Sequence, residues 1–314
     1  MTTSLHTPVL LLIFNRPGLT ARVVEEIRAA KPGKLYVGAD GPRSGVAGEK
    51  ESCIAARQAV TGADWDCEVK TLFREQNLGC RNAINSALDW FFQNENEGII
   101  LEDDCLPSGS FFGFAQELLA RYRDHSHVAM ISGTNYLGDR LRIVSSYCFS
   151  RYFSIWGWAS WRRVWQAHDK SMSEWESFRQ KGLLRQYYRQ AFMQRHVQKT
   201  YNLAWNGNVD TWDIQFSFSC LRSDALSVVP VVNLVSNIGG SGTHTSGDSR
   251  NINRPRFTLP ETPLIHPSSV APEPLYDEVF FQNEFGLHPL RWSPQRLRGL
   301  FNRIGRFTER GGGK

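Results

Sequence analysis

Short apolar runs alternate with stretches that repeat apolar residues every three or four positions through the first half of the chain. The runs at residues 8–14, 35–39, 67–73, 98–101 and 128–132 predict strands. The stretches at 19–27, 49–60, 83–91 and 111–122 each carry one apolar helical face and predict helices. Because strands and helices alternate, we expect an α/β fold with a mostly parallel central sheet flanked by helices.

Three polar loops follow predicted strands at the edge of the sheet where ligands bind. Asn15 and Arg16 follow the first strand, residues 40–43 follow the second, and residues 102–104 follow the strand at 98–101. In open parallel sheets, ligands bind beyond the carboxyl ends of the strands. The agreement of these positions predicts one site assembled from separate parts of the chain.

Three consecutive acids, Glu102, Asp103 and Asp104, come directly after a buried apolar strand. Crowded carboxylates are costly unless a positive charge neutralises them, and Mn²⁺ or Mg²⁺ prefers carboxylate and phosphate oxygen. We therefore expect Asp104 to bind the metal of a metal–nucleotide site. Glu102 and Asp103 would accept hydrogen bonds from ribose hydroxyls or orient metal-bound water. The alternative is a solvated acidic turn before a helix that begins near Ser110.

Arginines and an aspartate in or near the same loops are candidates for nucleotide contacts. The guanidinium groups of Arg16 and Arg43 fit phosphate bidentately or contact the base. Asp40 is a candidate acceptor for a uracil or ribose donor, although Asp-Gly-Pro also suits an ordinary turn. Arg81 lies near a helix N-terminus, which favours anions, so it either faces the diphosphate or is a surface arginine.

The second half is less regular and supplies candidate catalytic groups. Asp213 is a candidate general base for an acceptor hydroxyl, with Trp212 as an apolar wall beside it. Helix N-capping by Asp210 or Asp213 is the alternative. His244 follows a glycine-rich loop and is a candidate to complete the metal shell on a mobile lid, although a lone histidine is more often structural or exposed.

Composition and charge narrow the class of protein. The chain of 314 residues is 41% hydrophobic with 10 Trp and 19 Phe, which suits a soluble globular core and also rings that stack on sugars. The net charge of +5 is concentrated after Arg291, which argues against nucleic acid as a partner. Scattered cysteines predict reduced thiols in a cytosolic protein. The apolar run at 9–14 is too short for a membrane span or a signal peptide.

A basic amphipathic helix is predicted in the C-terminal tail, after a Pro-rich and irregular region that begins near residue 251. Apolar residues recur at helical spacing between 297 and 307, with arginines around them. The segment 291–310 is compatible with peripheral contact to an anionic membrane surface, and a helix docked on its own domain is the alternative.

The ordered set of these motifs resembles glycosyltransferases of the GT-A fold. It is similar to bacterial glycosyltransferase-2-like proteins and, more distantly, to N-acetylglucosaminyltransferase I. The resembling stretch runs from about residue 8 to residue 244. Its pieces, in the family's order, are Asn15-Arg16, Asp40, Glu102-Asp103-Asp104, Gly157-Trp158, Trp212-Asp213 and Gly242-Thr243-His244.

The resemblance implies a UDP-sugar donor, with N-acetylglucosamine as one candidate sugar, a Mn²⁺ or Mg²⁺ ion, and inversion at the anomeric carbon. The acceptor would be a hydroxyl of a glycan, glycolipid or protein. The positions matched by the resemblance are Asp104 and, more loosely, His244 for the metal, Asp213 for the base, Arg16 and Asp40 for the nucleotide, Glu102 and Asp103 for the sugar and ribose, and Gly157 and Trp158 for the sugar or acceptor pocket.

The resemblance also implies a division of the chain and a location. A Rossmann-like GT-A domain would cover residues 1–250, with a nucleotide-binding half at 1–133 and an acceptor-binding half at 134–250. Residues 251–314 would form an irregular extension. The chain looks like a cytoplasmic bacterial enzyme of polysaccharide biosynthesis, peripheral to the inner face of the plasma membrane if its tail binds lipid.

Two other functions are compatible with the residues. A sugar-phosphate nucleotidyltransferase would share the sheet, acids and metal, but a glycine-rich nucleotide loop would be expected after the first strand, where residues 15–18 supply one glycine. A non-enzymatic carbohydrate-binding protein would explain the aromatic residues but not the acids.

Overall fold

The computed structural model describes residues 5–62, 64–138, 143–240, 253–259 and 263–285. Strands and helices alternate through its first half, close to the bounds that the apolar pattern predicts. The elements of this half are β1 (Val9–Ile13), α1 (Pro17–Ala30), β2 (Lys34–Ala39), α2 (Glu49–Gln58), β3 (Glu68–Phe73), α3 (Cys80–Asn94), β4 (Glu97–Glu102), β5 (Cys105–Pro107), α4 (Gly109–Tyr122) and β6 (Val128–Ser132).

The second half contains shorter strands and a group of helices. Its elements are β7 (Tyr147–Ser150), β8 (Trp158–Trp161), α5 (Arg162–Gln166), α6 (Trp175–Gln180), α7 (Leu184–Tyr187), α8 (Ala191–Trp205), α9 (Asp213–Arg222), β9 (Leu226–Pro230), β10 (Val235–Asn237) and α10 (Pro274–Phe285).

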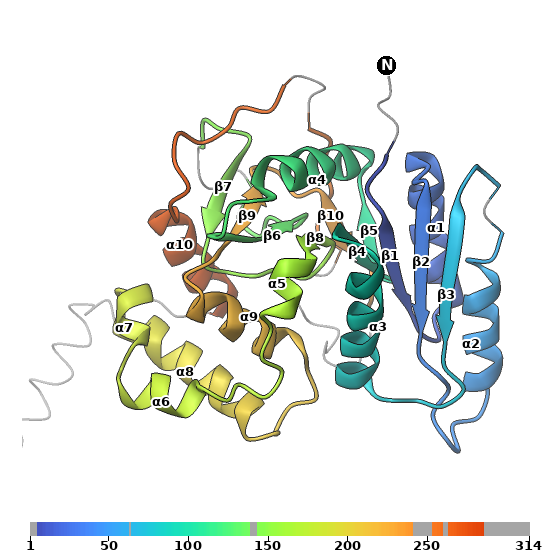
Figure 1. Cartoon of the computed structure of the whole chain (residues 1–314), viewed down its shortest axis with the longest axis horizontal. Helices are drawn as coiled ribbons and strands as arrows, with labels where there is room; N and C mark the ends of the chain where they lie inside the picture. Colours follow the sequence, from blue (N-terminus) through green and yellow to red (C-terminus); the bar gives the residue numbers. More distant parts are fainter. Residues whose placement is uncertain (1–4, 63, 139–142, 241–252, 260–262, 286–314) are drawn as a thin grey trace, which may run out of the picture.

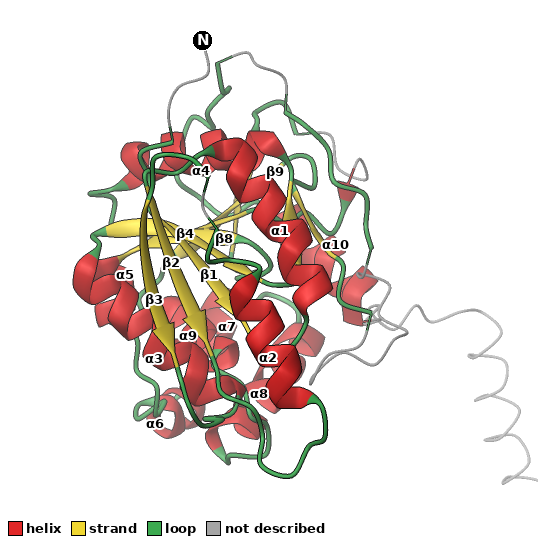
Figure 2. Ribbon diagram, turned by 90° about the vertical axis from the view of Figure 1, so that its right-hand side faces the viewer, coloured by secondary structure: helices red, strands yellow, loops and turns green. Residues whose placement is uncertain are grey.

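Eight strands form one sheet in the order β3-β2-β1-β4-β8-β6-β9-β7, and β5 pairs with β10 in a separate antiparallel ribbon. β1 is parallel to β2 and β4, β2 is parallel to β3, and β6 is parallel to β9. β8 is antiparallel to β4 and β6, and β7 to β9. The expected α/β class, with a mostly parallel sheet flanked by helices, is therefore confirmed (Figure 1, Figure 2).

The buried strands explain why both faces of the sheet are covered. Alternate residues of β1 enter two different apolar cores, because successive side chains of a strand point to opposite faces. Val9 and Leu11 join the core that includes α1 and α4, whereas Leu10 and Leu12 join the core that includes α3 and α9. A strand buried on both faces reads as a continuous apolar run, which is what residues 9–14 show.

β8 is absent from the strands that the sequence predicts, and it matters for the site. All four of its residues are buried, so it lacks the polar–apolar alternation that marks a half-exposed strand. Its antiparallel insertion between β4 and β6 sets Trp158 opposite Ile100. Because opposite residues share a face, Trp158 and Ile100 lie in the same core, together with α3 and α9.

The described residues after 252 pack onto the same body. Tyr276 and Phe280 of α10 lie in an apolar cluster with Leu137 and Val229, and Phe281 is buried among the helices α6 to α9. The domain boundary expected near residue 250 stays a prediction. None of the helices in the described part of the chain is long and apolar enough to cross a lipid bilayer.

Candidate functional site

The acidic triplet lies where β4 ends, beside the end of β1. Leu12 of β1 is in register with Glu102, the last residue of β4. Asp103 and Asp104 follow in the turn before β5 and are buried, whereas Glu102 is half-buried. The alternative of a solvated acidic turn does not fit this burial.

Arg16 joins Asp103 and Asp104 through one guanidinium group. Nη1 donates to Oδ2 of Asp104 at 2.9 Å, and Nη2 forms a short ion pair with Oδ1 of Asp103. The backbone N–H of Phe14 donates to the other carboxylate oxygen of Asp103 at 3.3 Å. The loops after β1 and β4 therefore meet, as the strand order predicts.

Burial and neighbouring charges shift the pKa values of Arg16, Glu102 and Asp103. Burial raises the pKa of Asp103 to about 6, although Arg16 opposes the shift. Burial of Arg16 disfavours its charge, but the two carboxylates outweigh that effect and raise its pKa further above its usual range. Desolvation, followed by repulsion from Asp104 and Asp103, raises the pKa of Glu102 to about 8. Burial and the neighbouring acids therefore both favour the protonated form of the Glu102 carboxyl group.

Leu12, which lies opposite Glu102, belongs to the core that includes α3 and α9, so Glu102 lies on the face of the sheet that these helices cover. Burial raises the pKa of the Cys80 thiol to about 12, and the negative charges of Glu102, Asp210 and Asp213 add to the shift. The charge of Asp213 also contributes to the raised pKa of Glu102. Asp213 and Glu102, far apart in the sequence, thus belong to one electrostatic neighbourhood.

The ribbon of β5 and β10 places a glycine against the acids. Asn237 pairs with Cys105, and the backbone N–H of Ile238 donates to the carbonyl of Asp104 at 2.8 Å. A β-carbon at Gly239 would lie 2.4 Å from Oδ2 of Asp104 and 3.1 Å from Nη1 of Arg16. Only a residue without a side chain fits there. The sequence signal was available, since the glycine-rich loop begins at this residue, but the candidate chosen there was His244.

The oxygen donors fit a divalent cation. Two carboxylates already share one positive group, and Mg²⁺ or Mn²⁺ is commonly held by one or two carboxylates plus substrate phosphates and water. Within the described ranges, no three His, Cys, Asp or Glu side chains gather to hold a metal by themselves. The acids therefore suit a metal that arrives with phosphate more than one caged by protein alone.

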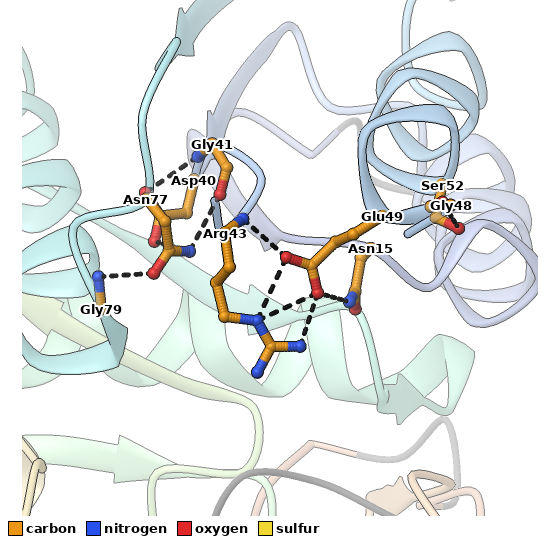
Figure 3. Close-up of polar contacts among 9 residues, drawn as sticks. All are labelled: Asn15, Asp40, Gly41, Arg43, Gly48, Glu49, Ser52, Asn77 and Gly79. Carbon is orange, nitrogen blue, oxygen red and sulfur yellow. Dashed lines mark hydrogen bonds and ion pairs between the residues drawn. The ribbon is translucent and has the colours of Figure 1, made fainter. Parts of the chain in front are cut away.

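Glu49 organises two of the predicted nucleotide contacts, as Figure 3 shows. Its buried carboxylate accepts hydrogen bonds from Nδ2 of Asn15 at 2.9 Å and from Nε of Arg43 at 3.0 Å. The backbone N–H of Arg43 also donates to it at 2.6 Å. Asn15 and Arg43 come from different loops, so Glu49 fixes the loop after β1 against the loop after β2. The sequence reading missed Glu49, whose signal was an acid in the first turn of a helix.

Asp40 serves as a turn residue in the structure. Its carboxylate accepts from Nδ2 of Asn77 at 2.9 Å and from the N–H of Gly41 at 2.9 Å (Figure 3). It also accepts from the N–H of Leu78 at 3.0 Å. Burial raises its pKa, while those backbone hydrogen bonds oppose the shift. The ordinary-turn interpretation describes these contacts, and a direct contact with uracil or ribose stays a prediction.

The remaining predicted residues of the nucleotide site and the base lie on helices. Nη2 of Arg81 donates to the carbonyl of Lys170 at 2.8 Å, so its guanidinium ties α3 to the loop after α5. Asp213 is half-buried and is the first residue of α9, with Trp212 at the N-cap position. Thr211 donates a short hydrogen bond to its carboxylate. The roles of Arg81 toward a diphosphate and of Asp213 as a base stay predictions.

Trp212, the residue before Asp213, belongs to an aromatic core. Trp212 is buried and stacks on Trp158 with ring centroids 5.7 Å apart. The indole Nε1 of Trp158 is buried and has no hydrogen-bond partner among the residues that the structure describes. Gly157 has a φ of +65°, and a β-carbon there would lie 2.7 Å from Val235. Gly157 and Trp158 therefore have packing roles, and their place in a sugar or acceptor pocket stays a prediction.

Two predictions lie outside the described residues. They are the metal-ligand role of His244 and the amphipathic tail at 291–310.

No protein-family model matches the chain, and no curated protein is similar to it in sequence. Partial structural similarities exist. The mannosyltransferase PcManGT from Pyrobaculum calidifontis, solved with GDP-Man and Mn²⁺, is 16% identical over 51% of this chain and 46% of its own length, with a TM-score of 0.36. HddC from Yersinia pseudotuberculosis, solved with GMP-PN, is 9% identical over 50% of this chain and 78% of its own, with a TM-score of 0.31.

A UDP-glucose pyrophosphorylase solved with UDP-glucose is 10% identical over 52% of this chain and 78% of its own, with a TM-score of 0.30. These similarities cover about half of the chain.

Proposed function

We propose that this protein is a metal-dependent, inverting glycosyltransferase that moves a sugar from a UDP-sugar to an acceptor hydroxyl. The observation that carries the proposal is the pair of buried carboxylates, Asp103 and Asp104, that meet around one cation at the carboxyl end of the sheet. The order of the motifs along the chain, which resembles that of GT-A glycosyltransferases, supports the nucleotide-sugar donor. N-acetylglucosamine is one candidate for the transferred sugar.

Asp104, with Asp103 beside it, would hold Mn²⁺ or Mg²⁺, which when bound supplies positive charge to a leaving diphosphate. Asn15 and Arg43 are held together by Glu49 in the neighbouring loops, where hydrogen bonds to the nucleotide would fix its position. Glu102, at the end of β4 beside Asp103, would accept hydrogen bonds from ribose hydroxyls or orient metal-bound water. These residues would bind and orient the donor.

Asp213 is the proposed general base. Its carboxylate would take the proton of the acceptor hydroxyl as the acceptor oxygen forms a bond to the anomeric carbon. The bond from that carbon to the phosphate oxygen breaks, and its electron pair leaves with UDP. Attack from the face opposite the leaving group inverts the configuration. Trp212, the residue before Asp213, is buried and stacks on Trp158, which would hold the start of α9 and its carboxylate in place.

A screen of nucleotide-sugars for donor hydrolysis, with and without Mn²⁺, tests the reaction. We expect release of UDP that requires the metal. Release of pyrophosphate from a nucleoside triphosphate would instead support a sugar-phosphate nucleotidyltransferase. Sugar binding without any nucleotide binding would support a carbohydrate-binding protein.

Calorimetry with the variant Asp104→Ala tests the metal site directly. We expect Mn²⁺-dependent UDP binding to weaken at least about 100-fold, because a metal ligand is lost. Asp64→Asn, an exposed acid paired with Arg28, is the matched control and should bind as the wild type does. Equal UDP binding by Asp104→Ala and the wild type would remove Asp104 from the metal site.

A further inference from the structure

Arg16 occupies the position of a cation between two acids. Its side chain is 27% exposed, whereas the side chains of Asp103 and Asp104 are 3% and 13% exposed. Two adjacent carboxylates at this depth require a positive partner, since an unpaired buried charge is strongly destabilising. The forked guanidinium has enough donors to serve both acids at once, which an ammonium group does less well.

The backbones on both sides of this contact are fixed. The carbonyl of Arg16 accepts hydrogen bonds from the N–H of Thr20 at 3.0 Å and from its hydroxyl at 2.9 Å, and Pro17 begins the helix. The carbonyl of Asp104 is bound by the N–H of Ile238. The part of the contact that can move is therefore the long side chain of Arg16, which is also its most exposed member.

We propose that Arg16 is a stand-in cation, which neutralises Asp103 and Asp104 until a divalent ion replaces its guanidinium there. This inference rests on the proposed function, because the metal is the one that the donor diphosphate brings. Once displaced, the guanidinium is free to pair with the anionic diphosphate, a bidentate match for its fork. Metal and nucleotide would then strengthen each other's binding. The metal frees the guanidinium to bind the diphosphate, and the diphosphate gives the displaced guanidinium a new anionic partner.

The stand-in role differs from a permanent structural bridge in its effect on metal affinity. A permanent bridge helps to position the acids, so its removal should leave Mn²⁺ binding unchanged or weaker. A stand-in cation competes with the metal, so its removal should make Mn²⁺ bind more tightly in the absence of nucleotide. The two possibilities therefore predict different changes in Mn²⁺ affinity when the guanidinium of Arg16 is removed.

The test is a titration of the full chain with Mn²⁺ alone, followed by electron paramagnetic resonance or calorimetry. For Arg16→Gln we expect at least about tenfold tighter Mn²⁺ binding than for the wild type, and at least about tenfold weaker UDP binding at saturating Mn²⁺. Arg28→Gln is the matched control, because it also removes an arginine that pairs with two carboxylates, those of Glu25 and Asp64, and it should leave Mn²⁺ and UDP affinity unchanged. Unchanged or weaker Mn²⁺ binding by Arg16→Gln would overturn the proposal.

A second measurement does not depend on the stability of a variant that leaves two acids unpaired. In the wild type, the side-chain Nε–H signal of Arg16, assigned by its loss in Arg16→Lys, should shift saturably on addition of Mg²⁺. An unaltered signal at saturating Mg²⁺ would overturn the proposal.

The same experiments separate this inference from the proposed function. If the wild type binds UDP only with Mn²⁺ while Arg16→Gln shows no gain in Mn²⁺ affinity, the stand-in role fails and the proposed function stands. If the variant gains Mn²⁺ affinity but the wild type binds no nucleotide under any condition, the proposed function fails and the competition between arginine and metal stands.

Discussion

The α-carbon of Gly239 faces the carboxylate of Asp104 so closely that a β-carbon would lie 2.4 Å from Oδ2. The contact joins two loops that are far apart in the sequence, and it depends on the pairing of β5 with β10. The position of Asp104 is therefore set by β10, which ends beside it, as well as by the turn between β4 and β5.

Gly239→Ala should displace Asp104 and the guanidinium of Arg16, which lies 3.1 Å from the same β-carbon position. Overpacking of this kind costs about 1–3 kcal/mol, so we expect Mn²⁺-dependent UDP affinity to fall by roughly 5- to 150-fold. Gly240→Ala is the matched control, because a β-carbon there meets nothing within 4 Å. Calorimetry of both variants checks the prediction, and equal losses in the two would contradict it.

Asp213→Asn should separate binding from chemistry. The amide keeps the size of the side chain and its hydrogen bond from Thr211 but cannot take a proton, so we expect UDP affinity to stay within about twofold of the wild type while turnover falls about 100- to 10,000-fold. The exposed neighbour Asp210→Asn is the control and should keep most of the activity. Steady-state kinetics with UDP-binding measurements provide the test. Normal turnover by Asp213→Asn would remove it as the base.

Glu49→Gln should loosen the loops after β1 and β2, which carry Asn15 and Arg43, without altering Asp103 and Asp104. The variant loses the charge that attracts Arg43 and weakens the hold on Asn15, so we expect UDP to bind about 5- to 20-fold more weakly, a change of about 1–2 kcal/mol. Mn²⁺ binding without nucleotide should not change. Glu51→Gln on the exposed side of the same helix is the control. A loss of Mn²⁺ affinity in Glu49→Gln would show that the two loops are not independent.

The sequence predicts the first half of the fold well because short apolar runs mark its strands and apolar residues repeated every three or four positions mark its helices. The run at 9–14 is apolar on both faces and becomes the central strand β1, and the order of strands and helices leads directly to a shared rim. The same argument brings Arg16 and Asp104 together, which the structure confirms at 2.9 Å. Local patterns suffice where neighbouring elements in the chain are neighbours in space.

Contacts made by chain-distant strands could not be predicted in this way. β8 enters the sheet between β4 and β6 with four buried residues and no alternation, and β10 reaches β5 from residue 235. The close approach of Gly239 to Asp104 follows from the pairing of β10 with β5. The charge state of Glu102 likewise depends on burial, which a list of acids in a row does not reveal.

Asp277 of α10 gives a pH dependence of stability outside the candidate site. Ser150 donates to Oδ1 at 2.5 Å and the N–H of Arg151 donates to Oδ2 at 3.3 Å, yet burial dominates and raises its pKa to about 7. The unfolded chain has an aspartate pKa of about 3.9. Between about pH 4 and pH 7 the folded state therefore binds more protons than the unfolded state, and stability falls as pH rises through this window.

The variant Asp277→Asn should remove this dependence, because the amide stays neutral while keeping an oxygen that accepts from Ser150. Relative to the wild type, its free energy of unfolding should be higher at pH 8 by about 1–4 kcal/mol and should lose that advantage toward pH 4. Asp169 provides a control of opposite sign. Burial opposes its charge, but hydrogen bonds from Ser171 and Ser173 lower its pKa to about 2, so Asp169→Asn should be less stable than the wild type at neutral pH. Urea unfolding across pH 4–8 measures both, and parallel curves for wild type and Asp277→Asn would show that the Asp277 carboxylate is not protonated in the folded protein.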